Sequence, residues 1–469
     1  MAVRNRGLQA SFFLLFVVPP VWGRSEAGAS ERSHPRRSNE GPITLPLSRR
    51  LVTLRGRNDD MSAFGVSANA FAEVKSFYLG TIGVGIPAES RQEMLVVFDT
   101  SSGQVVLDST RCDTPSCRQH RQYSAEKSGG KDVFVSGHVV KQGEIGDSAS
   151  ISFDSHDEEA GSVEGDLVRD TVCLGSERIT GSRGDACADI ILVAAENMTG
   201  EYFQQAPFDG VVGLSLAGLS INSESNFFGR LTTQIEGLEP QFALYVPRQP
   251  EDGRAEISFG GYNPNRLAGP LKWAPVVEPE KGAWQVHIAS VKIGNKVMDV
   301  CKEAACLGVV DSSSSHIGVP FAAWQDLEET IMLGIGVENK LSDDCTAGPD
   351  LHFTLNDGTA LTLTAKEYAM KSEIGCRTLL HPLSVGDHVG GKKYGAMQTQ
   401  IATELDGSFV LGEPLLRRYY TVFDWNANSL GFGLASGASP DPEDERPLQT
   451  EDFILLQCKQ SKKKIASLP

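Results

Sequence analysis

Two stretches of this 469-residue sequence decide its fold: Leu95-Val-Val-Phe-Asp-Thr-Ser-Ser-Gly-Gln104 and, in the second half, Val309-Val-Asp-Ser-Ser-Ser-Ser-His316. In each stretch, an apolar run typical of a buried strand ends in an aspartate, Asp99 or Asp311, that hydroxyl residues follow. A single copy of this pattern usually marks a turn that closes a strand. Its repetition, once in each half of the chain, favours a functional pair of carboxylates.

Further segments around the two stretches point to one protein family. Each aspartate is followed, within its own half, by apolar residues and a glycine, in Phe208-Asp-Gly-Val-Val-Gly213 and Phe409-Val-Leu-Gly412. Together with Ser76–Pro87, Phe259–Tyr262, Leu271–Pro275, Trp284–Val286 and Leu415–Trp425, these segments occur in the order seen in the pepsin-like aspartic proteases of the A1 family, which residues 77–435 therefore resemble. The resemblance implies a mainly β, bilobal pepsin-like fold with a central cleft.

The hydrophobic pattern independently predicts a β-rich chain. Short apolar or alternating runs recur between turn residues, and they predict strands at Leu95–Phe98, Val105–Leu107, Ile190–Val193, Phe242–Val246, Val286–Ile293, Leu351–Leu355, Phe409–Leu411 and Thr421–Phe423. The clearest helix is expected over Pro320–Leu333, where Phe321, Trp324, Leu327 and Ile331 follow at steps of three and four. The acidic stretch Asp154–Gly165 is expected to be a surface loop.

The resemblance implies an acid endopeptidase chemistry. Asp99 and Asp311 would meet at the base of the cleft and share one proton, because two close carboxylates cannot both ionise readily. Thr100 and Ser312 would link the lobes beneath the pair, and Ser102 and Ser314 would orient the carboxylates. One carboxylate would then take a proton from water while the other polarises the peptide carbonyl, without a metal ion, a cofactor or a covalent intermediate.

The sequence departs from the family at three places near this site. Ser101 and Ser313 stand where the family has glycine, and a side chain in such a tight loop is expected to strain it and reduce activity. Phe153 lies where the flap aromatic, usually tyrosine, is expected, and this residue with the Cys173/Cys187 pair resembles the apicomplexan branch of the family. A catalytically impaired relative that binds peptides or a protein partner in its cleft is therefore the alternative to an active protease.

A basic leader precedes an acidic body. The formal charge is −17, and residues 1–57 hold ten Arg and three Glu, a local charge of +7 that leaves −24 on the remainder. Arg4 and Arg6 precede the apolar run Phe12–Val18, which predicts a secretory signal peptide over residues 1–29. A membrane anchor is the alternative, but a spanning helix needs about 20 apolar residues.

These features divide the chain into five parts. The signal peptide is followed by a propeptide-like leader over residues 30–75, an N-terminal lobe over 76–275, a C-terminal lobe over 276–436 and a flexible tail over 437–469. The leader, with Ile43–Arg50 as its propeptide-like segment, is expected to suppress activity through arginines that lie over the acidic cleft.

A secretory route also predicts disulfides. Cys112/Cys117 and Cys301/Cys306 are close in sequence, Cys173/Cys187 and Cys345/Cys376 make two wider pairs, and Cys458 is left over. A zinc site is the alternative for the two short pairs. Asn197-Met-Thr199 is a glycosylation acceptor pattern.

The acidic composition gives no electrostatic reason to bind nucleic acid. The expected partners are a peptide or protein substrate and the chain's own propeptide. We expect a monomer without a transmembrane segment in its mature form, located in the lumen of an acidic or secretory organelle or outside the cell.

Overall fold

The computed structural model describes residues 41–55, 72–153, 161–175, 186–248, 252–301, 306–372, 375–383, 388–389, 391–394, 403–404 and 407–437. The described residues belong to one compact unit that begins at Glu40. The predicted signal peptide, Cys458 and nearly all of the predicted tail lie outside the described residues.

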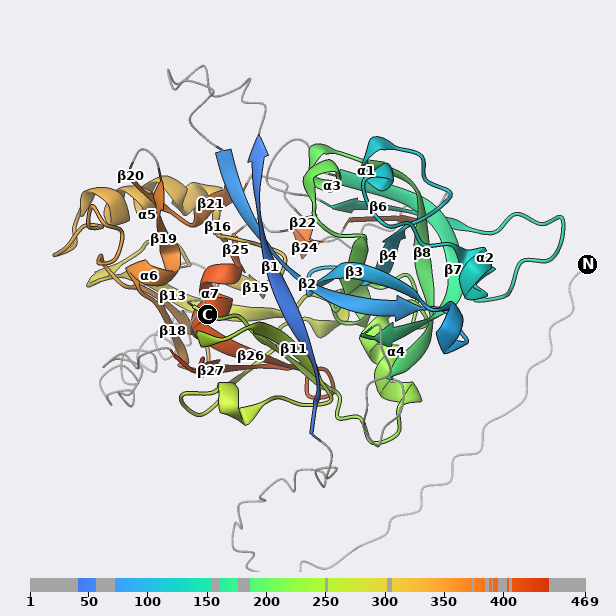
Figure 1. Ribbon diagram of the computed structural model, residues 1–469. Coiled ribbons are helices and arrows are strands. Elements are labelled where there is room, and N and C mark those ends of the chain that lie inside the picture. Colours follow the sequence, from blue (N-terminus) through green and yellow to red (C-terminus); the bar gives the residue numbers. More distant parts are fainter. Residues whose placement is uncertain are drawn as a thin grey trace, which may run out of the picture. The chain divides into compact units, whose positions relative to one another are not determined.

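A 15-stranded sheet runs through the N-terminal half and receives strands from both ends of the chain (Figure 1). Its order is β12 (Lys272–Pro275), β27 (Ser429–Leu434), β26 (Tyr419–Asp424), β10 (Gln241–Tyr245), β11 (Ala255–Phe259), β1 (Ile43–Arg55), β2 (Ala72–Val84), β3 (Gln92–Asp99), β9 (Gly210–Gly213), β4 (Val105–Asp108), β8 (Cys187–Thr199), β7 (Gly161–Leu174), β6 (Ser148–Phe153) and β23 (Gly391–Tyr394), with β5 (Lys131–Asp132) beside β7.

An eight-stranded sheet forms the framework of the C-terminal half. Its order is β18 (Ala360–Leu363), β17 (Leu351–Leu355), β13 (Gln285–Ile293), β15 (Cys306–Val310), β25 (Ser408–Leu411), β16 (Ile317–Pro320) and β21 (Leu380–Leu383), with β14 (Lys296–Val297) beside β13. Two small pairs complete the strands: β19 (Ala369–Ser372) with β20 (Gly375–Thr378), and β22 (His388–Val389) with β24 (Thr403–Glu404).

The helices are short. They are α1 (Pro115–Arg118), α2 (Ala125–Ser128), α3 (Glu201–Gln205), α4 (Phe227–Gln234), α5 (Phe321–Leu333), α6 (Ala365–Tyr368) and α7 (Glu413–Arg418). No helix in the described part of the chain is long and apolar enough to cross a membrane.

The strand predictions agree with this structure, and two local predictions need correction. All eight predicted runs lie in strands or, at Val246, one residue beyond one. Helix α5 forms where it was expected, but Phe321 is 63% exposed, because the buried face consists of Ala323, Leu327, Thr330 and Ile331. The end of the predicted acidic loop, Gly161–Gly165, belongs to β7 instead, and residues 154–160 lie outside the described residues.

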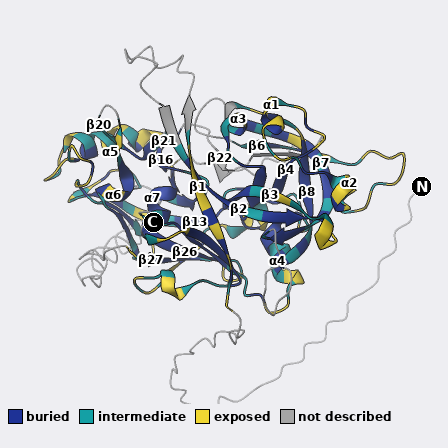
Figure 2. Ribbon diagram, viewed as in Figure 1, coloured by how far each residue is buried: buried dark blue, intermediate teal, exposed yellow. Residues whose placement is uncertain are grey.

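Apolar side chains of the strands form the core beneath the site. Figure 2 shows strands β3, β4 and β8 as largely buried, while the exposed positions concentrate on turns and short helices. Phe242 stacks on Phe423 with ring centroids 4.5 Å apart, and Trp284 packs edge-on against both rings. The Trp284 indole N–H donates to the carbonyl of Leu214 at 2.9 Å, which ties the first strand of the C-terminal half to the end of β9.

All four predicted disulfides are present. They join Cys112 to Cys117, Cys173 to Cys187, Cys301 to Cys306, and Cys345 to Cys376. The zinc alternative is therefore wrong for the two short pairs, because cysteines joined in a disulfide are not thiolate ligands.

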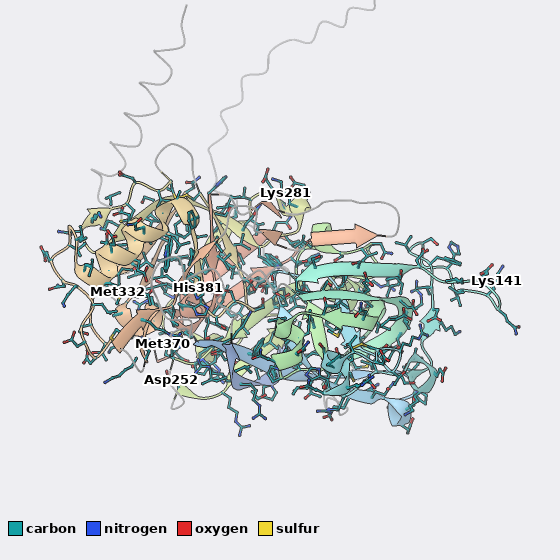
Figure 3. The ribbon with its side chains drawn as sticks, turned by 90° about the horizontal axis from the view of Figure 1, so that it is seen from above. Lys141, Asp252, Lys281, Met332, Met370 and His381 are labelled. Carbon is teal, nitrogen blue, oxygen red and sulfur yellow. A yellow bond between two sulfur atoms is a disulfide. The ribbon has the colours of Figure 1, made fainter. Side chains whose placement is uncertain are left out.

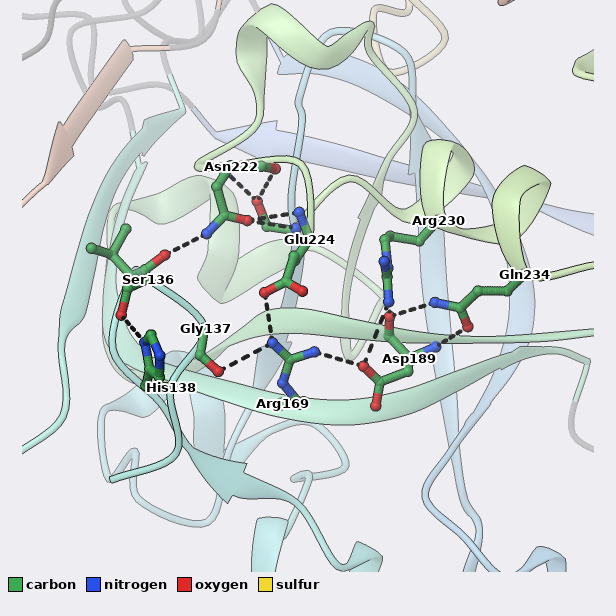
Figure 4. Close-up of polar contacts among 11 residues, drawn as sticks. Ser136, Gly137, His138, Arg169, Asp189, Asn222, Glu224, Arg230 and Gln234 are labelled. Atoms are coloured by element: carbon green, nitrogen blue, oxygen red, sulfur yellow. Dashed lines mark hydrogen bonds and ion pairs between the residues drawn. The ribbon is translucent and has the colours of Figure 1, made fainter. Parts of the chain in front are cut away.

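Ion pairs fix the long β7–β8 hairpin to its surroundings. Arg169 on β7 lies between Asp189 on β8 and Glu224, donating at 2.7 and 2.6 Å (Figure 4). The Arg169 side chain is only 21% exposed, so water screens these pairs less than it would at the surface. By contrast, Lys141 projects into solvent from the segment between β5 and β6 (Figure 3).

Candidate active site

The sheets place Asp99 and Asp311 at equivalent positions. Asp99 ends β3, which pairs in parallel with β9, so that Asp99 lies opposite Gly213. Asp311 directly follows β15, which pairs in parallel with β25, and its N–H donates to the carbonyl of Leu411 at 3.2 Å. Each aspartate therefore stands at the carboxyl end of a strand, and the neighbouring strand ends at a glycine (Gly213) or directly before one (Gly412).

The two glycines at these strand ends have a steric role. A Cβ at Gly213 would lie 2.5 Å from the backbone N of Gln104, and one at Gly412 would lie 2.3 Å from the carbonyl oxygen of His316. Both contacts are with backbone in the loop that follows an aspartate, and neither could be relieved by a rotamer change. Glycine thus allows each aspartate loop to fold tightly over the neighbouring strand.

Thr100 and Ser312 join the two halves directly behind the aspartates. The Thr100 hydroxyl donates to the carbonyl of Val310 at 2.9 Å and accepts the N–H of Ser312 at 3.0 Å. In the mirror arrangement, the Ser312 hydroxyl donates to the carbonyl of Phe98 at 2.7 Å and accepts the N–H of Thr100 at 3.0 Å. These four hydrogen bonds link the loops of the two halves directly next to the aspartates.

The hydroxyls that contact the carboxylates are not those expected from the sequence. Ser101 donates both its N–H and its Oγ–H to Asp99 Oδ1, at 2.9 and 2.7 Å. Ser313 does the same to Asp311 Oδ1, with both distances 2.8 Å. The predicted role of Ser102 and Ser314 needs correction, because the neighbouring serine already occupies the position from which a hydroxyl can reach the carboxylate.

Ser102 and Ser314 have other environments. The buried Ser102 Oγ has no hydrogen-bond partner among the residues that the structure describes. The Ser314 Oγ donates to the carbonyl of His316 at 3.1 Å and accepts its N–H at 3.4 Å, so it stabilises the loop after Asp311. His316 in turn packs against His381, with ring centroids 4.3 Å apart (His381 is labelled in Figure 3).

The backbone does not carry the strain that the two serines were expected to cause. In the described part of the chain, the non-glycine residues with positive φ are Glu278, Cys301, Cys345 and Asn428. Ser101 and Ser313 are thus outside the left-handed region, where an L side chain would be unfavourable. The sequence-based reason to expect an impaired site is therefore not supported by the loop conformation.

The two carboxylates act electrostatically on each other. Burial and the negative charge of Asp99 raise the pKa of Asp311 to about 6, while the hydrogen bonds from Ser313 and the charge of Lys75 act to lower it. Asp99 is itself only 4% exposed. A buried carboxyl beside a second carboxylate holds a proton in weakly acidic solution, as general acid catalysis requires.

This paired geometry agrees with a comparison of the sequence with known proteins. The sequence description of the eukaryotic aspartyl protease family matches residues 77–435, which include both aspartates and both lobes. The chain belongs to this family. Two large sheets, each with an aspartate at a strand end, are the bilobal pepsin-like fold that the sequence predicted.

Similar aspartyl proteases include mouse cathepsin E, 26% identical over 394 residues that cover 81% of this chain and 88% of the relative. Mouse gastricsin is 28% identical over 378 residues, covering 78% of this chain and 83% of the relative. Chicken pepsin A is 27% identical over 360 residues, covering 76% of this chain and 84% of the relative.

Tyr202 on α3 is a residue of the candidate site that sequence reasoning missed. Burial and the charges of both Asp99 and Asp311 raise the pKa of Tyr202, so its phenol lies within the field of the pair. The Lys75 ammonium lies 4.5 Å from the centre of the Tyr202 ring. No sequence pattern links Lys75 or Tyr202 to the aspartates. The fold places them near the pair, because β2 carries Lys75 and α3 carries Tyr202.

The flap candidate Phe153 ends β6 and packs edge-on against Phe203, with ring centroids 5.2 Å apart. Phe203 follows Tyr202 on α3, so the aromatic contact joins the end of β6 to the segment beside the carboxylates. Asn197, the glycosylation candidate, lies on β8 opposite Glu164 and is partly exposed.

Proposed function

We propose that this protein is an aspartic endopeptidase of the secretory pathway that hydrolyses internal peptide bonds by activating a water molecule between Asp99 and Asp311. The observation that carries the proposal is the symmetric placement of Asp99 and Asp311, whose loops are joined across the halves by Thr100 and Ser312. Membership of the family and four disulfides support a protease made in an oxidising compartment.

In the proposed reaction the two carboxyl groups have different protonation states. Asp311, whose pKa is raised to about 6, carries the proton and donates it in a hydrogen bond to the carbonyl oxygen of the scissile peptide. Asp99 then accepts a proton from the attacking water. When the tetrahedral intermediate breaks down, a proton passes from the pair to the leaving amine. One proton then remains on the pair, and a new water molecule binds between the two carboxyl groups.

We further propose that the chain is made as a zymogen whose leader covers this site. Lys75, at the end of the predicted leader, acts by its charge on Asp311. Arg49 donates to the buried Glu413 at 2.9 Å and to Ser76 at 2.8 Å. In this proposal Lys75 contributes positive charge beside the pair, in addition to the arginines that the sequence analysis assigned to the leader.

Within the family, we place the chain near the apicomplexan branch on the basis of Phe153 and the Cys173–Cys187 disulfide. A peptide-binding relative without activity is the alternative that the sequence suggested. The expectation of loop strain that favoured it lacks support from the backbone of Ser101 and Ser313.

The test is peptide cleavage by the purified chain after incubation at acidic pH, with Asp99→Ala as the matched inactive variant and a pepstatin-type inhibitor. We expect internal cleavage of the peptide below about pH 6 that both the substitution and the inhibitor abolish. A folded chain without cleavage at any acidic pH, or cleavage that survives Asp99→Ala, would contradict the proposal.

A further inference from the structure

The serines that replace the family's glycines make the same contact in both halves of the molecule. Ser101 and Ser313 each donate an N–H and an O–H to a single oxygen, Oδ1, of the aspartate two residues before. The four distances lie between 2.7 and 2.9 Å. Glycine at these positions would retain the N–H donor but lose the hydroxyl.

We propose that Ser101 and Ser313 are positioning residues. Their hydroxyls hold the carboxylates of Asp99 and Asp311 in place and lower the pH range over which the pair is catalytically competent. The inference rests on the proposed function, and it reverses the expectation that these serines impair the site. Two features of the loops carry it: the hydroxyls contact the carboxylates in both halves, and neither serine has a strained backbone.

The direction of the shift follows from the donors. A hydroxyl that donates to a carboxylate stabilises the ionised form more than the protonated form, so it lowers the pH at which the group binds its proton. At Asp311 this effect opposes burial and the charge of Asp99. Among the described residues, the other charged or titratable groups that act on the pair are Lys75 from β2, whose charge also favours the ionised form, and Tyr202 from α3, which stays neutral because its pKa is raised.

The hydroxyl and strain explanations predict different results for the same positions. If the hydroxyl matters, Ser313→Ala and Ser313→Gly both remove the donor, and both raise the pH at which Asp311 titrates by about one unit. If strain matters, Ser313→Gly alone changes the site and improves activity. Ser313→Thr retains a hydroxyl and is expected to restore the parent's pH dependence.

The experiment uses the full chain with ¹³C-labelled aspartate and follows the Asp311 carboxyl by NMR from pH 3 to 8, assigned with Asp311→Asn. The pH profile of kcat/KM is measured on the same preparations. We expect Ser313→Ala to shift both the titration of the Asp311 carboxyl and the alkaline limb of the kcat/KM profile to higher pH, by the same amount. Ser101→Ala should move the profile in the same direction, and the double variant further than either single one, though not by their sum.

Ser102→Ala is the matched comparison, because it removes a nearby buried hydroxyl that has no hydrogen-bond partner within the described residues. We expect it to leave the Asp311 titration in place. An unchanged titration in Ser313→Ala, or an equal shift in Ser102→Ala, would overturn the inference. The NMR measurement needs no catalysis, so a protein that shows the shift without cleaving peptides would contradict the proposed function but not the role of the serines.

Discussion

Asp311 shows how far the surroundings of one residue determine its chemistry. The two motifs that carry Asp99 and Asp311 are nearly identical in sequence and in their local hydrogen bonds. The charges around them come from other elements, namely the opposite aspartate and Lys75. The same residue type in a solvated turn would be ionised above about pH 4.

This residue should make the folded protein more stable in acid. Since the Asp311 pKa is raised from 3.8 to about 6 in the folded protein, its contribution to stability is largest below about pH 4 and is lost as the pH rises through 6. Two pKa units correspond to on the order of 3 kcal/mol. We therefore expect the unfolding free energy of the parent, relative to Asp311→Asn, to fall by about this amount between pH 4 and 7.

The measurement is urea unfolding of both proteins at a series of pH values. Asp113→Asn is the control, because the Asp113 side chain is 94% exposed. A difference between the parent and Asp311→Asn that stays constant from pH 4 to 7 would show that Asp311 does not bind its proton as proposed.

At the scale of elements, α3 is linked to β4 through His120, whose side chain is 11% exposed. His120 lies between the Asp108 carboxylate of β4 and the carbonyl of Ala206, the residue that ends α3, at 2.8 Å from each. Both partners are acceptors, so both ring nitrogens can donate only when the imidazole is protonated. Because α3 carries Tyr202, the charge state of His120 should affect the wall of the active site.

The sign of this pH dependence can be worked out. Burial alone would lower the His120 pKa, but the hydrogen bond and charge of Asp108, the Ala206 carbonyl and the charge of Asp209 together raise it above 6.5. The stability that His120 provides is therefore complete below about pH 6.5 and is lost as the pH rises through the folded-state pKa. Burial also raises the pKa of Asp108, so the stability that this carboxyl provides is likewise lost as the pH rises through its own folded-state pKa.

We expect His120→Gln to speed hydrogen exchange of residues 201–206 relative to the parent at pH 5, because the charged link to α3 is gone. The difference between the two proteins should disappear at alkaline pH, where His120 of the parent is neutral. His138→Gln is the control, since His138 is exposed. Equal protection of α3 in parent and His120→Gln at pH 5 would contradict this account.

At the scale of the whole molecule, strand β1 of the predicted leader is part of the large sheet of the protein that the leader is proposed to inhibit. β1 pairs with β11 through Ile43–Leu47 and with β2 through Ser48–Arg55, so it bridges two groups of strands in the large sheet (Figure 1). β2 begins at Ala72 and therefore runs across the predicted boundary between residues 75 and 76. The backbone N–H of Ser76 also donates to the Ser315 hydroxyl at 2.8 Å, close after Asp311.

Arg49 is the charged contact through which we expect the leader to be held. Its guanidinium pairs with Glu413, whose side chain is 6% exposed, but the Arg49 side chain is 44% exposed, so water still screens the pair from one side. We expect Arg49→Gln to weaken the hold of the leader by about 1 kcal/mol, and hence to raise the peptidase activity of the unprocessed chain at mildly acidic pH several-fold.

The comparison is with Arg50→Gln, the next residue of the same strand, because Arg50 is also exposed but has no ion pair among the described residues. Activity and leader cleavage are followed together by mass spectrometry after a shift to acid. Equal activation in Arg49→Gln and Arg50→Gln would mean that only the net charge of the leader matters. A precursor as active as the processed chain would count against a zymogen.

The sequence by itself determined the strands and the disulfides, and it singled out the two aspartates that we propose to be catalytic. These features have local signals: apolar runs between turn residues, closely spaced cysteines, and a motif that occurs twice. The predicted helix also formed, although its buried face could not be read correctly at Phe321, because burial there depends on which neighbouring strands cover the helix.

Only the tertiary structure decided which hydroxyl contacts each carboxylate, and which cation and which tyrosine lie beside the pair. Ser101 and Ser102 are adjacent and chemically identical, so their roles depend on loop torsions that the strand ends and the glycines at 213 and 412 impose. Lys75 and Tyr202 reach the aspartates from distant segments. The energies that place them arise from burial and from charges across the fold, which act between residues that no sequence pattern connects.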